Sequence, residues 1–324
     1  MTSDAVLIIS TAVDAATDAV QHKLDGRGVP CIRLDTEQFP FDSQLSLSVG
    51  GTPGTPHMSY HPRGSAIAIA KSPRSTWYRR VRTPTRPEAM DQGVYEFCMR
   101  ESRAALVGSC MSVADKVMSH PASVWQAEFK PFQLSVASAA GFCVPKTLVS
   151  NSPDRIRDFH DEGRRALIVK PVRSGYFEYG GEPRVIYTNR FLDEHLSNLD
   201  SARIAPSIYQ EFVPKSLDIR VTYVGGRCFS AAIHSQTDVA AAVDWRRTDD
   251  EHLPHSRHEL PHALEKIIRD YMNTLGLNFG ALDFALTPDG VYHFLEVNPN
   301  GQWLWLDHQL DLGITDAVAD WLSG

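Results

Sequence analysis

The chain has 324 residues, of which 43% are hydrophobic and 22% charged, and its 32 basic and 39 acidic residues give a formal net charge of −7. This composition predicts a soluble globular protein with a substantial core, and the negative charge argues against general affinity for nucleic acid. No apolar run approaches the roughly 20 residues that a membrane-spanning helix needs, and the N-terminus has no secretory signal, so we expect no membrane association. Five scattered cysteines without a Cys-x-x-Cys pair fit a reduced cytoplasm.

The N-terminal part of the chain predicts a β-α-β unit. Residues 5–10 form an apolar run typical of a strand, residues 15–24 have helical character, and residues 29–35 predict a second strand after a glycine-rich turn. This order implies a parallel sheet with a right-handed crossover. The other elements predicted before residue 118 are antiparallel strands at 46–50 and 57–61 and a helix within 88–117.

Aromatic and basic residues cluster in the segment Trp77-Tyr78-Arg79-Arg80, which Arg82 follows. One interpretation is an amphipathic edge strand whose arginines reach out to solvent along their aliphatic stems. The other is a site for an anion or a partner, because paired guanidinium groups recognise such ligands. The sequence leaves both open.

The middle of the chain combines a broken helix with lysine-bearing strand ends. Helical character from about 122 to 140 is interrupted at Pro131, directly after Lys130, and Gly141 is expected to end the helix. The apolar strand 166–169 ends at Lys170, which would place the Lys170 ammonium group at the mouth of a cleft. The other elements expected here are strands at 142–149 and 207–213, a glycine-rich hairpin at 173–188 and a short helix at 191–201.

Glycines and prolines divide the C-terminal part into short elements. Gly225-Gly226 predicts a tight turn between strands 218–224 and 227–233. The four histidines between 252 and 262 are interrupted by prolines, and no carboxylate lies at a recognised ligand spacing, so we expect a solvated linker there. Two further histidines on strands could do acid–base chemistry or fill the core, and helices are expected at 259–275 and 314–322 (His234, His293).

The segment 281–303 organises the whole interpretation. Two short apolar runs flank Thr287-Pro288-Asp289-Gly290, whose proline, aspartate and glycine are turn residues, so we predict a β-hairpin. The expected register sets Leu286 opposite Val291 and Asp283 opposite Phe294.

In that register three oxygen-bearing side chains share one face of the hairpin. Asp283 and Glu296 are diagonal neighbours, and Asn298 follows on the same face. Carboxylates are seldom buried without a partner, and three oxygen ligands suit Mg²⁺, which usually also takes oxygens from a substrate phosphate. The alternative is an edge hairpin whose acids face water, and a bulge at Gly290 would shift the register by one residue.

Other residues complete a candidate nucleotide site. Lys130 and Lys170 would supply positive charge to phosphates, and Asp218 is placed to accept hydrogen bonds from ribose hydroxyls. The end of the strand 207–213 could offer main-chain donor and acceptor groups to an adenine edge (Gln210, Glu211, Phe212, Val213).

The order of these residues resembles the ATP-grasp superfamily: two lysines, Gln-Glu-Phe-Val, Asp-x-Arg, and finally Asp283, Glu296 and Asn298 as D-(x₁₂)-E-x-N. Three further motifs resemble the microviridin-type ligases, also called graspetide synthetases or ATP-grasp ribosomal peptide maturases. They are TWYRR at Thr76, DWR at Asp244 to Arg246, and EVNPNGQW at Glu296 to Trp303.

The resemblance implies a mixed α/β (α+β) ATP-grasp fold. A β-α-β pre-ATP-grasp domain (1–118) would precede a central subdomain (119–206) and a C-terminal subdomain (207–324), with the nucleotide between the last two. It further implies ATP and Mg²⁺ as cofactors, a ribosomal precursor peptide with leader and core as partner, leader binding at the hairpin 173–188, and a homodimer.

The implied reaction is ATP-dependent closure of side-chain esters or amides. A peptide Asp or Glu becomes an acyl phosphate, which a Ser, Thr or Lys side chain then attacks. Arg220 and Arg246 are our candidates for holding the acceptor carboxylate and the tetrahedral oxyanion. Trp245 and Trp303 could wall this chamber against water or could be packing residues.

Two alternatives of different kinds remain. One is a small-molecule carboxylate–amine ligase of the glutathione-synthetase or glutamate-ligase type, which the WYRR and NPNGQW features disfavour. The other is a nucleotide-binding regulatory protein without turnover, which the intact set of three metal-ligand candidates disfavours.

Overall fold

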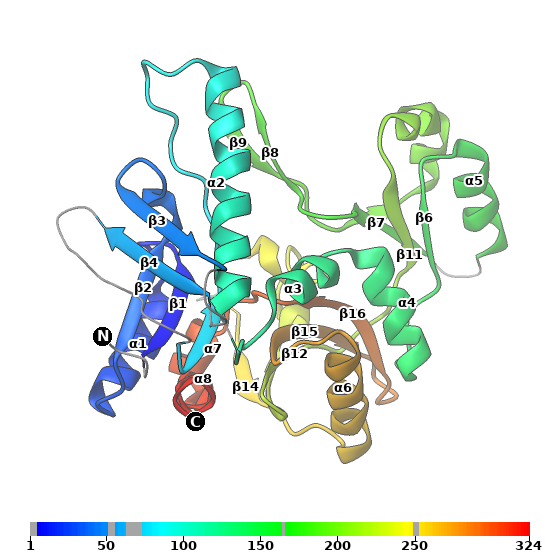
Figure 1. The fold of residues 1–324 in the computed structure, drawn as a ribbon. Helices are drawn as coiled ribbons and strands as arrows, with labels where there is room; N and C mark the ends of the chain where they lie inside the picture. The colour runs from blue at the N-terminus through cyan, green and yellow to red at the C-terminus, as the bar shows by residue number, and fades with distance from the viewer. Residues whose placement is uncertain (1–4, 51–55, 63–72, 114, 164–165, 249–252) are drawn as a thin grey trace.

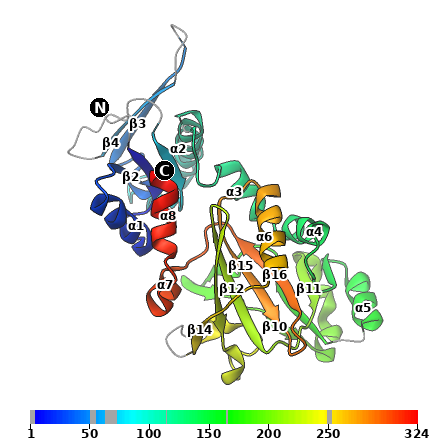
Figure 2. The same cartoon turned by 90° about the horizontal axis from the view of Figure 1, so that it is seen from below.

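The structure is a computed structural model of the chain, and it describes residues 5–50, 56–62, 73–113, 115–163, 166–248 and 253–324. Figures 1 and 2 show the chain from two directions, with the N-terminal and C-terminal ends close together. Residues 249–252, which contain most of the expected acidic linker and His252, lie outside the described residues.

A three-stranded parallel sheet forms the N-terminal part, in the order β2-β1-β5. Its strands are β1 (Val6–Ser10), β2 (Cys31–Asp35) and β5 (Ser75–Tyr78), and α1 (Ala15–Gly26) is the crossover. Every residue of β1 is buried, as its apolar run predicts. The β-α-β prediction is therefore confirmed.

The C-terminal helix α8 (Ile314–Ser323) packs against this N-terminal sheet and α1. Val318 and Leu322 join Val20 and Leu24 in one buried cluster. Lys23 of α1 also pairs with Asp316 of α8, at 2.9 Å. The two ends of the chain thus share one core.

A second layer covers the other face of the N-terminal sheet. Strands β3 (Ser43–Ser48) and β4 (His57–Pro62) pair antiparallel, as expected, and α2 (Gln92–Val113) runs beside them. Leu106 and Cys110 of α2 pack with Met58 and Tyr60 of β4 in a common cluster.

The predicted broken helix is two helices, α3 (Pro121–Ala127) and α4 (Lys130–Ala140). Proline at the second position of α4 costs no hydrogen bond, because that amide has no partner in a first turn. Gly141 ends α4 with φ +96°, a left-handed conformation that favours glycine. Lys130 therefore lies at the N-terminus of α4.

A four-stranded sheet follows, in the order β10-β7-β11-β6. The helix α5 (Pro153–Glu162) and the 3₁₀ segment η2 (Asp193–Ile204), which replaces the expected short helix, share its small core. The exposed hairpin of β8 (Tyr176–Tyr179) and β9 (Glu182–Val185) projects from this sheet, as Figure 1 shows. The strands of the sheet are β6 (Thr147–Ser150), β7 (Leu167–Pro171), β10 (Asn189–Phe191) and β11 (Ser207–Glu211).

The third sheet has five strands in the order β14-β13-β12-β15-β16. Helices α4 and α6 (His262–Thr274) cover one face, where Phe142 stacks on Phe294 with ring centroids 5.0 Å apart. The turn between β12 and β13 uses Gly225 and Gly226, both with positive φ, as predicted. The strands are β12 (Leu217–Val224), β13 (Arg227–Ile233), β14 (His255–Arg257), β15 (Phe279–Leu286) and β16 (Tyr292–Asn298).

The β15–β16 hairpin has a different register from the expected one. Leu286 pairs with Tyr292 instead of Val291, and Phe284 pairs with Phe294. A bulge at Leu295 then inserts one residue, so that Asp283 pairs directly with Glu296. The offset at the turn and the bulge cancel, and the two acids still share one face.

Two predictions in the C-terminal part were wrong. The histidine segment is not a solvated linker, because β14 pairs with β13, and His258 Nε2 lies 2.8 Å from the Tyr292 hydroxyl. A helix that the sequence did not predict, α7 (Leu304–Leu310), follows β16. Among the helices of the described residues, none has the length and apolarity required to cross a membrane.

Candidate active site

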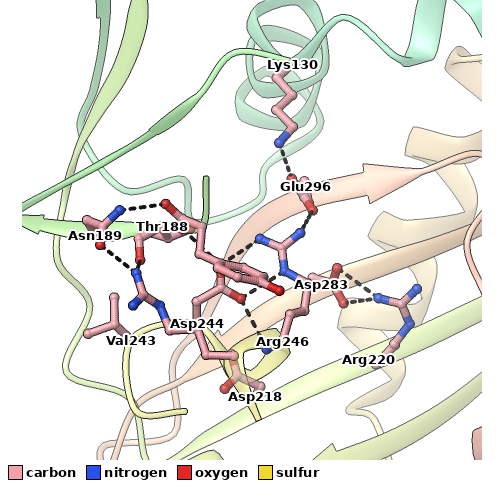
Figure 3. A network of polar contacts seen from close by, with 12 residues as sticks. Lys130, Thr188, Asn189, Asp218, Arg220, Val243, Asp244, Arg246, Asp283 and Glu296 are labelled. Carbon is pink, nitrogen blue, oxygen red and sulfur yellow. Dashed lines mark hydrogen bonds and ion pairs between the residues drawn. The ribbon is translucent and has the colours of Figure 1, made fainter. Parts of the chain in front are cut away.

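The acids of the β15–β16 hairpin lie where the five-stranded sheet faces the four-stranded sheet, and Figure 3 shows their surroundings. A cavity of about 650 Å³, here the hairpin cavity, lies below the base of β8–β9 and is lined by Lys130, Lys170 and Glu296 among others. A second cavity of about 550 Å³, here the tryptophan cavity, is lined by Arg220, Asp283, Trp245 and Trp305 among others. Arg246, Glu296 and Asn298 line both.

Basic residues hold the two paired acids. Arg220 Nη1 lies 2.9 Å and 3.1 Å from the two carboxylate oxygens of Asp283. Lys130 Nζ lies 2.8 Å from Glu296 Oε2. Asn298 is exposed on the same face, and its Oδ1 accepts a hydrogen bond from the amide of Asn300 at 3.0 Å. The structure therefore brings together all three residues predicted to bind a metal.

Asp244 orients Arg246 through two parallel hydrogen bonds. Arg246 Nε and Nη2 donate to the two Asp244 oxygens at 2.8 Å and 2.7 Å, and Arg246 Nη1 lies 3.9 Å from Glu296. The amide of Thr188, directly after the β8–β9 hairpin, also donates to Asp244 Oδ2, at 3.0 Å. Hydrogen bonding from Arg246 outweighs burial and lowers the pKa of Asp244. Asp244 thus joins the hairpin base to the candidate catalytic arginine.

Burial and charge shift the pKa values of the network. Although burial raises the pKa of Glu296, the ammonium groups of Lys130 and Lys170 outweigh it and hold the pKa at about 2. Burial lowers the pKa of Lys170 to about 8, against the attraction of Glu296. Burial raises the pKa of Asp283, against the charge of Arg220. Glu296 is therefore the fixed negative charge of the site.

The predicted adenine-contacting residues line a small pocket of about 70 Å³ beside Lys170. The amides of Glu211 and Phe212 already donate to the carbonyls of Lys146 and Ala166, at 2.9 Å and 2.7 Å. The Gln210 side chain is buried and donates to Thr147 Oγ1 at 2.8 Å. These contacts narrow the predicted main-chain donors to Val213.

Asp218 lines a pocket of about 60 Å³ between Lys170 and Asp283. Its carboxylate lies 2.8 Å from Lys215 Nζ and accepts a hydrogen bond from Ser235 Oγ at 2.5 Å. Sequence reasoning missed Lys215, which is almost wholly buried. The signal was available, because a lysine three residues before a predicted ribose-binding acid could pair with it.

Of the two predicted chamber tryptophans, only Trp245 lines a cavity. Trp303 is wholly buried, with its ring centroid 5.9 Å from that of Trp77, so its assignment to the chamber wall was wrong. Trp305, which the sequence analysis missed, packs beside Trp245 with ring centroids 5.6 Å apart. The alternation of Trp303 and Trp305 around Leu304 was the available signal.

Neither strand histidine lines these cavities. His234 Nε2 lies 3.0 Å from Ser256 Oγ, and His293 Nδ1 lies 3.3 Å from the sulfur of Cys143. Both positions are outside the network of Figure 3.

The donor set fits a hard divalent cation. Asp283, Glu296 and Asn298 provide oxygen ligands only, which Mg²⁺ prefers. Two carboxylates on adjacent strands would repel one another without positive charge, and Arg220 and Lys130 supply that charge in this structure. Across the described ranges, no group of three or more His, Cys, Asp or Glu side chains is arranged to hold a metal. The site therefore depends on the amide oxygen of Asn298.

The fold and this site define an ATP-grasp ligase with an N-terminal pre-ATP-grasp domain. Residues 5–124 match the family model of the MvdD pre-ATP grasp domain. A comparison with curated proteins returned no match.

Solved structures match over the whole chain. The macrocyclase MdnC of Microcystis aeruginosa, bound with its precursor peptide MdnA, is 31% identical with a TM-score of 0.86, over 98% of this chain and 99% of that one. MdnB of the same organism is 32% identical with a TM-score of 0.80, over the same shares. A RiPP-associated ATP-grasp ligase of Chryseobacterium gregarium, in complex with ADP and a leader and core peptide, is 26% identical with a TM-score of 0.90, over 98% and 96%. The chain belongs to the graspetide-type family of ATP-grasp ligases.

Proposed function

We propose that this chain uses ATP to activate Asp or Glu side chains of a ribosomal precursor peptide and closes side-chain ester or amide macrocycles. One observation carries the proposal. The Asp283–Glu296–Asn298 face, with Lys130 and Arg246 beside it, opens on two large cavities in a chain that matches peptide macrocyclases over its full length.

Residues around the hairpin cavity would bind the nucleotide. Lys130 and Lys170 would contact phosphate oxygens, Asp218 the ribose hydroxyls, and the amide of Val213 the adenine edge. Mg²⁺ held by Asp283, Glu296 and Asn298 would neutralise negative charge on the transferred phosphoryl group. Nucleotide binding would then replace the Lys130–Glu296 ion pair with contacts to phosphate.

The peptide carboxylate reacts in two steps. Its oxygen attacks the γ-phosphorus of ATP, an O–P bond forms, and ADP leaves with the electrons of the broken bond. The Ser, Thr or Lys side chain then attacks the acyl carbon, and inorganic phosphate leaves. Arg220 and Arg246 would hold the acceptor carboxylate and the oxyanion, because both guanidinium groups line the tryptophan cavity.

Trp245 and Trp305 would limit the access of water to the acyl phosphate. Their paired rings form part of the tryptophan cavity. Hydrolysis of the acyl phosphate returns the free carboxylate, so an apolar wall favours ring closure.

The finer features are also proposals. We place the enzyme in the cytoplasm, where its five free cysteines would stay reduced, and retain the homodimer. The three-part division at 118 and 206 also remains a proposal. Because β11 pairs with β7, we propose that the second boundary lies after Glu211.

Release of ADP tests the function. We expect a precursor peptide with Asp or Glu and Ser, Thr or Lys in its core to stimulate ADP release, with loss of one water per ring by mass spectrometry. Stimulation by a free amino acid instead would indicate a small-molecule ligase. Stimulation by neither, with intact nucleotide binding, would indicate a regulatory protein.

Nucleotide affinity should depend on the protonation of Lys170, whose pKa is about 8. Bound phosphate favours the ammonium form, so the complex holds more protons than the free protein above that pH. Affinity for Mg·ADP is therefore expected to fall as the pH rises above about 8, by up to roughly tenfold per pH unit. Calorimetry on the wild type and on Lys170→Arg, which stays charged, measures this. Equal pH dependence in both would contradict the prediction.

A further inference from the structure

Arg79 is wholly buried at the end of β5, although it was predicted to reach solvent or to bind an anion. Its Nη1 donates to the carbonyls of Asn300 and Gly301, at 2.8 Å and 3.1 Å. Its guanidinium carbon lies 4.6 Å from the ring centroid of Trp303. Both interpretations of this arginine were therefore wrong, and its contacts are with one loop from the other end of the chain.

That loop, residues 298–303, begins at the proposed metal ligand Asn298. Arg220 Nη2 donates to the Gln302 carbonyl at 3.2 Å, so two buried arginines bind successive carbonyls of the loop from opposite sides. Gly301 has no room for a side chain, because a Cβ there would lie 2.3 Å from the Ala281 Cβ and 3.1 Å from Arg220 Nη2. The position of the loop is thus tightly constrained.

Asp14 supplies the counter-charge to Arg79. Asp14 Oδ2 lies 3.6 Å from Arg79 Nε and accepts a hydrogen bond from Ser10 Oγ at 2.9 Å. Arg79 outweighs burial, and the pKa of Asp14 is lowered. Arg79 therefore carries a full charge and a fixed orientation where the N-terminal sheet meets the loop.

Stability alone is a weak reason for such an arrangement. A buried ion pair is often replaceable by apolar residues without loss of stability, because both charges must be desolvated. The contacts of Arg79 are directed at the carbonyls next to Asn298, and groups that orient metal ligands commonly act in this way.

We propose that Arg79, held by Asp14, is a positioning residue that fixes the loop 298–303, so that Asn298 and Arg220 keep the orientation needed for Mg·nucleotide and for the acceptor carboxylate. The inference rests on the proposed function. It gives the N-terminal domain a direct part in the assembly of the active site.

The first test compares Arg79→Lys with Arg82→Lys, a control at an exposed arginine three residues later. Without peptide, the Mg²⁺ concentration for half-maximal ADP binding should rise roughly 10- to 100-fold in Arg79→Lys, because lysine cannot contact both carbonyls. The Asn300 and Gly301 amides, which donate to Asn298 at 3.0 Å and 3.1 Å, should exchange hydrogen faster. Arg82→Lys should change neither property.

The second test is kinetic. In Arg79→Lys the kcat of ring closure should fall about 10²-fold, as expected for a small misplacement of catalytic groups. The KM for the peptide should stay unchanged. A variant that is folded, with wild-type Mg²⁺ dependence and wild-type exchange in the loop, would overturn the proposal.

Asp14→Asn keeps the test decisive if Arg79→Lys does not fold. It removes the counter-charge without a change of volume, so a smaller shift of Mg²⁺ dependence in the same direction is expected. A lowered melting temperature with an unchanged Mg²⁺ requirement would show a structural role only and would also overturn the proposal. Because ADP binding and exchange need no peptide, failure of the wild type to close rings would reject the proposed function separately.

Discussion

Glu296→Gln should abolish ring closure while the protein remains folded. The substitution keeps the side-chain volume but removes the negative charge that faces Lys130 at 2.8 Å and Arg246 at 3.9 Å. One of the two carboxylate ligands for Mg²⁺ is lost at the same time. Because each metal contact to a phosphoryl group contributes several kcal/mol, we expect turnover to fall about 10³-fold or more. Mass spectrometry of the peptide, read as loss of water per ring, measures this.

The matched control is Glu259→Gln, at an exposed glutamate outside these cavities. It should close rings at the wild-type rate. Circular dichroism of both variants separates loss of chemistry from loss of fold. Full ring closure by Glu296→Gln would exclude the proposed metal site, and Asp283→Ala would provide an independent check at the opposite strand.

Arg246→Lys should be the next most damaging change. Lysine keeps the positive charge but cannot make the two parallel hydrogen bonds to Asp244, at 2.8 Å and 2.7 Å, and present a third nitrogen to the cavity. Loss of one oriented donor at a developing oxyanion typically costs 10²- to 10³-fold in kcat, so a fall of roughly that size is expected. Rapid-quench measurement of ring closure determines kcat directly.

Affinity for ADP distinguishes this effect from general damage. It should change little in Arg246→Lys, because Lys130 and Lys170 provide the phosphate contacts in our proposal. Arg227→Lys, at an exposed arginine at the start of β13, should leave both properties unchanged. An Arg246→Lys enzyme with wild-type kcat would remove Arg246 from the proposed catalytic groups.

The candidate site was predictable because it depends on local alternation. Acids within apolar strands share a face every second residue, so Asp283, Glu296 and Asn298 could be grouped from the sequence. The register was not predictable, because the bulge at Leu295 has no glycine or proline to indicate it. The grouping was right although the pairing was wrong.

Long-range contacts limited the rest. Burial of Arg79 depends on carbonyls more than 200 positions away in the sequence, at Asn300 and Gly301. The roles of Trp303 and Trp305 depend on where α7 begins, and no capping residue marks that start. Local patterns describe one element at a time, whereas these features arise from two elements meeting.

The paired irregularities of the β15–β16 hairpin restrict how this enzyme can be re-engineered. A designer who shortens the turn at Gly290 by one residue without also straightening the bulge at Leu295 would rotate Glu296 and Asn298 into the apolar interior. Loop grafts on this scaffold should therefore treat the turn and the kink as a single unit. The same coupling suggests that natural insertions near the turn would survive only in pairs.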